Sequence, residues 1–197
     1  LVYLIDGGLL FLGNLQIDGG TLIVDSGTIG SYSISITNGG TLALYAGGAI
    51  TSYSSYASCE ISIDTTSFFI MNGGTMTGIN VQNSGTFSMN GGTISGYKGS
   101  KNVILNTGTF AMSGESEISN NMVTGNDLIQ NEGTFTMTGG KITGNEAIGK
   151  VLLFFKIKRS TFINKGTFTM SGGEISNNTA DGKGGGLLID VTGSAEL

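Results

Sequence analysis

The stretch Gly-Thr-Phe-Thr-Met-Ser-Gly-Gly-Glu-Ile-Ser-Asn-Asn, from Gly166 to Asn178, is the fullest copy of the repeat that predicts the fold. Gly-Thr-Phe also occurs at Gly85, Gly108 and Gly133, each time followed by one residue, a Met and a Gly-containing turn. Aligning the copies on Phe extends the pattern along the whole chain, at intervals of 18 to 33 residues. This Phe column consists of Leu22, Leu42, Phe69, Phe87, Phe110, Phe135, Phe168 and Ala195. Such self-similarity is typical of proteins that stack one unit on the next.

Three further apolar columns accompany the Phe column. The second lies two residues after it, a period that indicates a strand, and consists of Val24, Leu44, Met71, Met89, Met112, Met137, Met170 and Leu197. The third lies seven or eight residues after the Phe column and consists of Ile29, Ile50, Met76, Ile94, Ile118, Ile142 and Ile175. The fourth lies six residues before the Phe column and consists of Ile36, Ile63, Val81, Ile104, Ile129 and Phe162.

The four columns predict three short strands per repeat, none of which can bury its apolar side alone. Stacked at the ~4.8 Å spacing of paired strands, the repeats would form an all-β parallel β-helix of about eight coils, each of roughly 18 to 33 residues. An antiparallel β-sandwich would explain the Gly-rich turns but not four columns held in register. Polar residues four positions before the Phe column predict an asparagine ladder at a corner, made of Asp18, Asn38, Asn83, Asn106, Asn131 and Asn164.

A single β-helix domain is expected to cover residues 1–197, with a regularity that varies along the chain. Residues 1–64 make less regular coils, residues 65–178 carry clear repeats with an insertion near 146–160, and residues 179–197 begin a further coil. Because the chain stops within a recognisable motif, we expect an excerpt of a longer protein whose neighbouring coils continue the stack.

The insertion contains the sequence Val-Leu-Leu-Phe-Phe-Lys-Ile-Lys-Arg, Val151 to Arg159, which resembles no other part of the chain. Three interpretations stay open. The segment is a loop that projects to grip a partner, an extra strand that seals the coil, or the product of a reading-frame slip.

Composition argues against several classes of function. The net charge is -5 with only nine Lys and Arg, whereas binding to nucleic acid depends on basic residues. No apolar run approaches the ~20 residues of a membrane-spanning helix. The chain has no His and one Cys, Cys59, so the commonest metal ligand and the usual nucleophile–base pairs are missing. We therefore expect no cofactor, no metal and no catalytic residue.

Acidic residues offer the remaining route to catalysis, because hydrolysis of a glycosidic bond normally uses two carboxylates. The nearest candidates are Glu115 with Glu117, and Glu174 with Glu146. Other repeats carry Thr or Lys at the matching positions, which favours a solvated face. The alternative function is a carbohydrate-active β-helix, a polysaccharide lyase or glycoside hydrolase, with a degraded or missing active coil.

The pattern Asn-x-Gly-Thr-Phe-Thr-Met-Ser-Gly-Gly-x-Ile-Ser-x-Asn resembles the repeats of large bacterial surface and secreted proteins. The match is clear over Asn83–Asn145 and Asn164–Asn178, and Thr179–Ile189 is similar to a linker between such repeats. Polymorphic outer-membrane autotransporters are a more distant likeness, through Gly47–Ile50 and Phe11–Asn14. The resemblance implies a pectin-lyase-like right-handed β-helix that serves as a repetitive passenger or stalk at the cell surface or outside the cell.

The expected function is thus a non-catalytic structural or adhesive module of a bacterial cell-surface or secreted protein, or a purely passive scaffold. Its partners would be host or matrix glycans or proteins, and not nucleic acid. Aromatic side chains on an outer face would favour glycan binding. The candidate contact residues are Tyr32, Tyr53, Tyr56 and Tyr97.

Overall fold

The computed structural model describes residues 2–53, 58–149, 151–152, 155–156, 159–182, 185–190 and 192–196, a part of the chain that contains strands and turns but no helix. The strands are β1 (Val2–Asp18), β2 (Thr21–Thr37), β3 (Thr41–Ser52), β4 (Cys59–Ile63), β5 (Phe68–Thr77), β6 (Ile79–Asn83), β7 (Thr86–Ser95), β8 (Lys98–Gly99), β9 (Ile104–Asn106), β10 (Thr109–Met112), β11 (Glu117–Ser119), β12 (Met122–Thr124), β13 (Ile129–Asn131), β14 (Thr134–Thr143), β15 (Glu146–Ile148), β16 (Val151–Leu152), β17 (Phe155–Lys156), β18 (Phe162–Asn164), β19 (Thr167–Ser176), β20 (Thr179–Ala180), β21 (Leu187–Ile189) and β22 (Ser194–Glu196).

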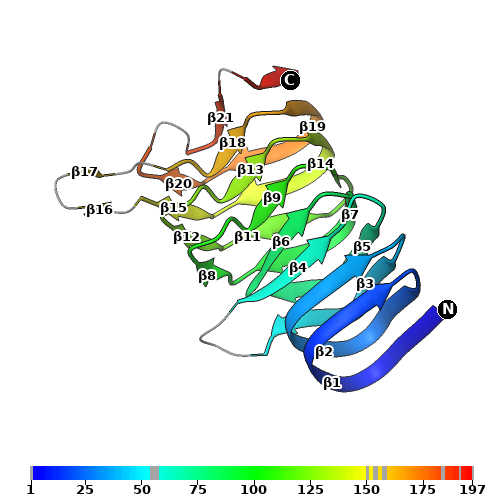
Figure 1. The fold of residues 1–197 in the computed structure, drawn as a ribbon. Helices are drawn as coiled ribbons and strands as arrows, with labels where there is room; N and C mark the ends of the chain where they lie inside the picture. The colour runs from blue at the N-terminus through cyan, green and yellow to red at the C-terminus, as the bar shows by residue number, and fades with distance from the viewer. Residues whose placement is uncertain are drawn as a thin grey trace.

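The large sheet consists of two rows of strands that share β2. One row runs β2-β3-β5-β7-β10-β14-β19-β22, and the other runs β2-β4-β6-β9-β13-β18-β21. Strand β1 pairs with β2, β11 pairs with β7 and β14, and a smaller sheet has the order β20-β15-β12-β8. These pairings are parallel, so strands of successive repeats lie side by side, as Figure 1 shows. The architecture is all-β, built largely of parallel strands, and compatible with a parallel β-helix.

The strand register confirms the Phe column over its full length. Leu22 pairs with Leu42, Leu42 with Phe69, and Phe69 with Phe87. The remaining pairs join Phe87 to Phe110, Phe110 to Phe135, Phe135 to Phe168 and Phe168 to Ala195. The third column is confirmed in the same way, from Ile29 to Ile175. The second column is confirmed from Val24 to Met170, and its expected last member, Leu197, lies outside the described residues.

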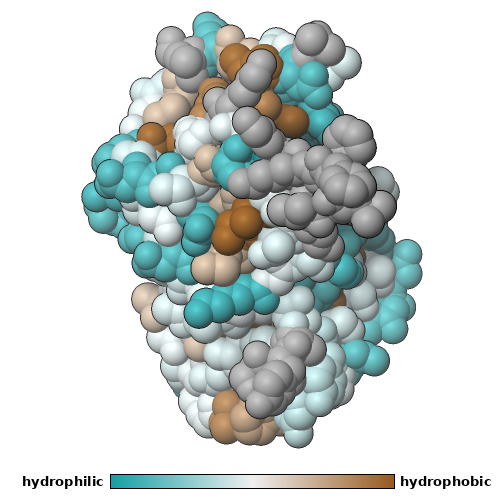
Figure 2. Space-filling model, turned by 90° about the vertical axis from the view of Figure 1, so that its left-hand side faces the viewer, coloured by the Kyte–Doolittle hydropathy of each residue, from teal (hydrophilic) through white to brown (hydrophobic). Residues whose placement is uncertain are grey.

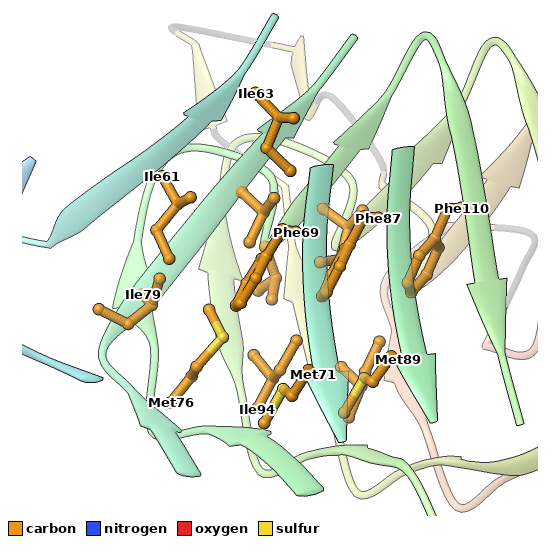
Figure 3. Close-up of a cluster of buried hydrophobic side chains, with 14 of the residues drawn as sticks. Ile61, Ile63, Phe69, Met71, Met76, Ile79, Phe87, Met89, Ile94 and Phe110 are labelled. Atoms are coloured by element: carbon orange, nitrogen blue, oxygen red, sulfur yellow. The ribbon is translucent and has the colours of Figure 1, made fainter. Parts of the chain in front are cut away.

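Stacked aromatic rings fill the middle of the core. The ring centroids of Phe69, Phe87, Phe110 and Phe135 are separated in turn by 4.8, 4.9 and 4.5 Å, with interplanar angles of 3°, 19° and 26°. These separations match the spacing of adjacent strands, so ring stacking and backbone pairing are satisfied together. All four rings are fully buried, and Figure 3 shows Met71 and Met89 beside the first two of them.

The glycine of each Gly-Thr-Phe motif lies where one repeat approaches the backbone of the previous one. A Cβ atom on Gly133 would lie 2.1 Å from the carbonyl oxygen of Gly108, and one on Gly166 would lie 2.1 Å from that of Gly133. Gly85 and Gly108 are in similarly close contact with backbone oxygens. The motif therefore keeps its glycine because no side chain fits between the repeats.

The fourth column is wrong at its N-terminal end. The sequence alignment places Ile63 beside Val81, but Ile61 pairs with Val81, and Ile63 pairs with Asn83. Ile36 pairs with Ile63 and is displaced with it.

The displacement has a cause in the corner that precedes the Phe column. Four residues, 64–67, connect β4 to β5, whereas two, 84–85, connect β6 to β7. The longer corner is held by Asp64, whose carboxylate accepts hydrogen bonds from the backbone N–H groups of Thr66 and Asn38 at 3.0 and 2.8 Å.

A buried asparagine ladder occupies this corner in the later repeats. The side-chain nitrogens of Asn83, Asn106 and Asn131 each donate to the side-chain oxygen of the next member, at 2.7, 2.7 and 2.6 Å, ending at Asn164. The ladder stops at Asn83, whose Oδ1 is buried and has no partner, because the neighbouring position is Ile63.

Asp18 and Asn38, also predicted for this ladder, lie outside it. Asn38 donates to Asp18 through its side chain at an exposed corner, and its backbone has a φ of 54°. The ladder positions of these two repeats are Ile17 and Ile36, which are buried.

A second asparagine ladder and the short strands of the smaller sheet were not predicted. Asn121 donates to Asn145, and Asn145 donates to Asn178, both at 3.0 Å. From Thr86 onward, the link after the third column contains an additional short strand in each repeat. These strands are β8, β12, β15 and β20, and they form the smaller sheet. Most of these repeats still have three strands, because β7, β14 and β19 each span two of the expected strands, whereas the repeat from β9 to β12 has four. Buried Val123 and Ala147 give the additional strands an inward side.

The N-terminal end of the stack is open. β1 pairs only with β2 among the described strands. Ile5, Leu15 and Leu22 help to line a hollow of about 530 Å³ at this end. The exposed large apolar side chains of β1 are Val2, Tyr3, Leu4, Leu9, Leu10 and Phe11.

Replacing Gly133 by Ala should lower the free energy of unfolding by about 3 kcal/mol, because a Cβ atom cannot fit without moving the corner. Guanidinium denaturation measures the change. Gly13→Ala is the control, since a Cβ atom there would have nothing within 4 Å, and its effect should stay within about 0.5 kcal/mol. Equal stability of the two variants would contradict the close approach at Gly133.

Replacing Asn106 by Leu should lower the free energy of unfolding by about 3 kcal/mol, because Asn131 then keeps a buried oxygen without a donor. Asn83→Leu should have a smaller effect, since it also removes the oxygen that already has no partner. Thermal denaturation of both variants compares them. A larger loss for Asn83→Leu would show that the ladder is not the source of the stabilisation.

Candidate functional site

The four predicted tyrosines have different environments. Tyr32 and Tyr53 lie on the surface, with 45% and 48% of their area exposed. Tyr56 lies outside the described residues. Tyr97 is 1% exposed and accepts a hydrogen bond from the backbone N–H of Lys101 at 3.1 Å, so its prediction as an outward contact residue is wrong. The additional strand that follows Tyr97 folds the link over its ring.

Tyr32 and Tyr53 belong to an aromatic cluster whose third member, Phe11, was not predicted. Their ring centroids are 4.7 Å apart, and the ring of Phe11 lies 5.4 Å from Tyr53 at an interplanar angle of 87°. We call Phe11, Tyr32 and Tyr53 the aromatic corner. The three residues come from three successive repeats, on β1, on β2 and just after β3, so the corner runs along the stack.

Local backbone geometry places these rings. Phe11 pairs with Gly30, where a Cβ atom would lie 2.4 Å from a ring carbon of Phe11. The missing side chain therefore lets the phenyl ring lie across β2. The backbone N–H of Tyr53 donates to the carbonyl of Ser31 at 3.0 Å, which fixes Tyr53 beside Tyr32.

A row of polar side chains begins next to Tyr32. Asn14 pairs with Ser33, Ser33 with Glu60, and Glu60 with Asn80, on four neighbouring strands. The hydroxyl of Ser33 donates to the side-chain oxygen of Asn14 at 2.8 Å. Hydrogen-bonding groups thus lead away from the aromatic corner at the spacing of the strands.

The row ends at a shallow cavity, which we call the polar groove, lined by Asn80, Gln82, Lys101, Asn102, Leu105 and Asn126. One oxygen of Glu60 accepts hydrogen bonds from Lys101, Gln82 and Asn80 at 2.6, 2.9 and 3.0 Å. Partial burial alone would raise the pKa of this carboxyl, but the three hydrogen bonds and the Lys101 charge lower it. Glu60 is therefore a charged group that gathers donors at the groove.

The acidic candidates are only partly brought together. Glu117 pairs with Lys141, and Lys141 pairs with Glu174, so these three charged residues form a row. Glu115 lines one surface hollow together with these three residues, whereas Glu146 lies in the smaller sheet. Two strand spacings separate the Cα atoms of Glu117 and Glu174 by about 9.6 Å, with Lys141 between them.

The insertion forms an antiparallel hairpin of β16 and β17 that projects from the stack in Figure 1. One carboxylate, that of Asp181, accepts the backbone N–H groups of Gly149 and Arg159 at 2.9 and 3.0 Å, and so joins both ends of the hairpin. Asp127 accepts the N–H of Ser160 at 2.6 Å. Because β16 and β17 pair with each other, the prediction of an extra strand that seals the coil is wrong.

On the face in Figure 2, hydrophobic residues form separate groups among polar ones. Among the described residues, no three His, Cys, Asp and Glu side chains lie close enough to hold a metal ion. The same residues contain no helix of the length and hydropathy needed to cross a membrane.

The fold is all-β, with parallel strands in repeat register, and its outer face carries an aromatic corner beside a polar groove. No family model, curated protein or solved structure matches the chain.

Cys59 should be unreactive in the folded protein. It is fully buried, and burial, with a smaller effect of the Glu60 charge, raises the pKa of its thiol to about 12. Because the thiolate is the form that reacts, we expect no alkylation by iodoacetamide at mildly alkaline pH, and full alkylation after unfolding. Mass spectrometry measures the label, and rapid labelling of the folded chain would contradict the burial of Cys59.

Proposed function

We propose that this chain is a right-handed parallel β-helix of about eight coils that serves as a non-catalytic, adhesive module of a bacterial cell-surface or secreted protein. The repeat pattern and the parallel register support the β-helix. The observation that carries the adhesive function is the aromatic corner. Three large rings stay exposed there while they contact one another.

Exposed rings of this kind are suited to sugars. An aromatic face packs against the C–H groups of a sugar ring, and neighbouring polar groups bind its hydroxyls. The aromatic corner adjoins the polar row from Asn14 to Asn80, which supplies such groups. The proposed partners are therefore host or matrix glycans, or glycoproteins that carry them, met outside the cell.

A carbohydrate-active enzyme is the second candidate. It is supported by one observation, the row of Glu117, Lys141 and Glu174 in neighbouring strands. In this arrangement one Glu would protonate the leaving oxygen and the other would activate water. Release of reducing ends from oligosaccharides, lost in both Glu117→Gln and Glu174→Gln, would favour this candidate over the adhesive one.

The adhesive proposal predicts saturable retention of the purified chain on some members of a panel of glycans and matrix proteins, in excess of a charge-matched control protein. Tyr53→Ala should weaken this retention by roughly tenfold, because it removes the ring that contacts both Phe11 and Tyr32. Tyr45→Ala is the matched control, since Tyr45 is 37% exposed but lies outside the aromatic corner. Absence of retention on every ligand would refute adhesion and leave a passive scaffold.

A further inference from the structure

The outer edge of β1 ends the described stack on its N-terminal side, where Figure 1 shows β1 as a curved strand. Among the described strands β1 pairs only with β2, so its other edge offers backbone N–H and C=O groups to a further strand. Five side chains of β1 lie beside buried residues of β2 and also line the hollow of about 530 Å³, namely Tyr3, Ile5, Leu10, Leu15 and Ile17. The apolar core therefore meets water at this edge.

These five inward residues are placed symmetrically about Leu10. Ile5 and Leu15 lie five residues before and after Leu10, and Tyr3 and Ile17 lie seven residues before and after it. A two-fold axis at Leu10 would set the β1 strands of two copies antiparallel, with inward side chains opposite inward side chains. The inward residues of the second copy would then cover the hollow of the first.

The stack does not impose this symmetry on every coil. The residues of the third coil that match Ile5, Leu10 and Leu15 are found through the register with β2, and they are Leu44, Ile50 and Ile61. Leu44 lies six residues before Ile50, whereas Ile61 lies eleven residues after it. β2 shares the symmetric spacing but is covered by β1, so the symmetric coil stands at the free edge.

The outward residues of β1 also match under this axis. Leu9 and Phe11 are 59% and 54% exposed, and each would lie opposite the other from the second copy. Asp6 would lie opposite Asn14, whose amide can donate to the carboxylate. The second carboxylate of the strand, that of Asp18, would lie opposite an apolar residue. The arrangement thus covers exposed apolar surface and sets no like charges directly opposite one another.

The size of the edge is sufficient for a stable contact. β1 has 17 residues, and Gly20, Thr21 and Leu22 line the same hollow. Each copy therefore contributes about 20 residues, as in an interface of standard size. A head-to-tail contact would instead use the last strands, β21 and β22, which have three residues each. The extent of the edges favours the contact of β1 with β1.

We propose that two copies of this chain associate through the free edges of β1, as antiparallel strands related by a two-fold axis at Leu10. Such a contact is closed, so it gives a dimer and no larger assembly. The inference goes beyond the proposed adhesive function and does not depend on it. Because Phe11 is next to Leu10 in the chain, the dimer would bring the aromatic corners of both copies close to the axis.

Sedimentation velocity of the purified chain over a range of concentrations tests the association, and the wild type should be a dimer that dissociates on dilution. Leu10→Arg places two cations opposite each other on the axis and should raise the dissociation constant at least roughly hundredfold. Ile189→Arg is the matched control, because Ile189 is 45% exposed but lies on β21, and its dimer should persist. Circular dichroism and the thermal midpoint check that each variant folds.

Single cysteines locate the axis independently of the charge variant. Only residue 10 lies opposite its own copy in the proposed dimer, so Leu10→Cys should form a disulfide-linked dimer under mild oxidation. Leu4→Cys should form far less, although Leu4 is 61% exposed and Leu10 only 40%, because residue 4 lies opposite Gln16. The native Cys59 is buried and gives no cross-link. Electrophoresis without reductant measures the linked fraction.

The outcomes are distinct from those of the adhesive proposal. A monomer at every concentration, or a dimer that Ile189→Arg dissociates and Leu10→Arg leaves intact, would overturn the two-fold association. Cross-linking of Leu4→Cys equal to that of Leu10→Cys would overturn it as well, because the axis would then lie elsewhere. Retention on glycans is measured separately, so a monomer that binds them through Tyr53 would still uphold adhesion.

Discussion

The close approach of one repeat to the backbone of the next governs how the described repeats pack. Parallel pairing fixes this approach at the strand spacing, and at the Gly-Thr-Phe corner it leaves no room for a Cβ atom. Once the backbones are so close, like side chains must lie above like. Phenyl rings then stack at 4.5 to 4.9 Å, and asparagine amides meet at hydrogen-bond distance.

The buried columns, which this close approach governs, could be predicted from the sequence. The lengths of the corners, which it leaves free, could not. Buried columns such as Leu22 to Ala195 follow from a period of two within strands and from repetition between them. Counting back from the Phe column failed at Ile63, because corner length is set locally by Asp64 and not by the core. The ladder of Asn121, Asn145 and Asn178 has a signal in the sequence, because each Asn lies three residues after one of the last three Ile of the third column.

The candidate site was harder to predict because outward side chains are not determined by the stack. Tyr32 and Tyr97 both lie three residues after an Ile of the third column, yet Tyr32 is exposed and Tyr97 is buried. The difference arises from the link after Tyr97, which contains an additional strand, and a single-residue pattern does not reveal how a link folds. Phe11 matched the apolar residues around it in sequence, and only its pairing with Gly30 shows that it lies across the outer surface.

The two halves of the chain thus differ in the side chains that occupy their corners. The later repeats satisfy their corners internally, through two asparagine ladders and an additional sheet. The first repeats have apolar corners at Ile17 and Ile36 and carry the exposed rings. Because outward groups on neighbouring strands recur at about 4.8 Å, a ligand that extends along the stack meets several weak contacts in succession. Linked weak contacts add up through effective concentration, so under the proposed adhesive function a long glycan would gain more from that row than a short one.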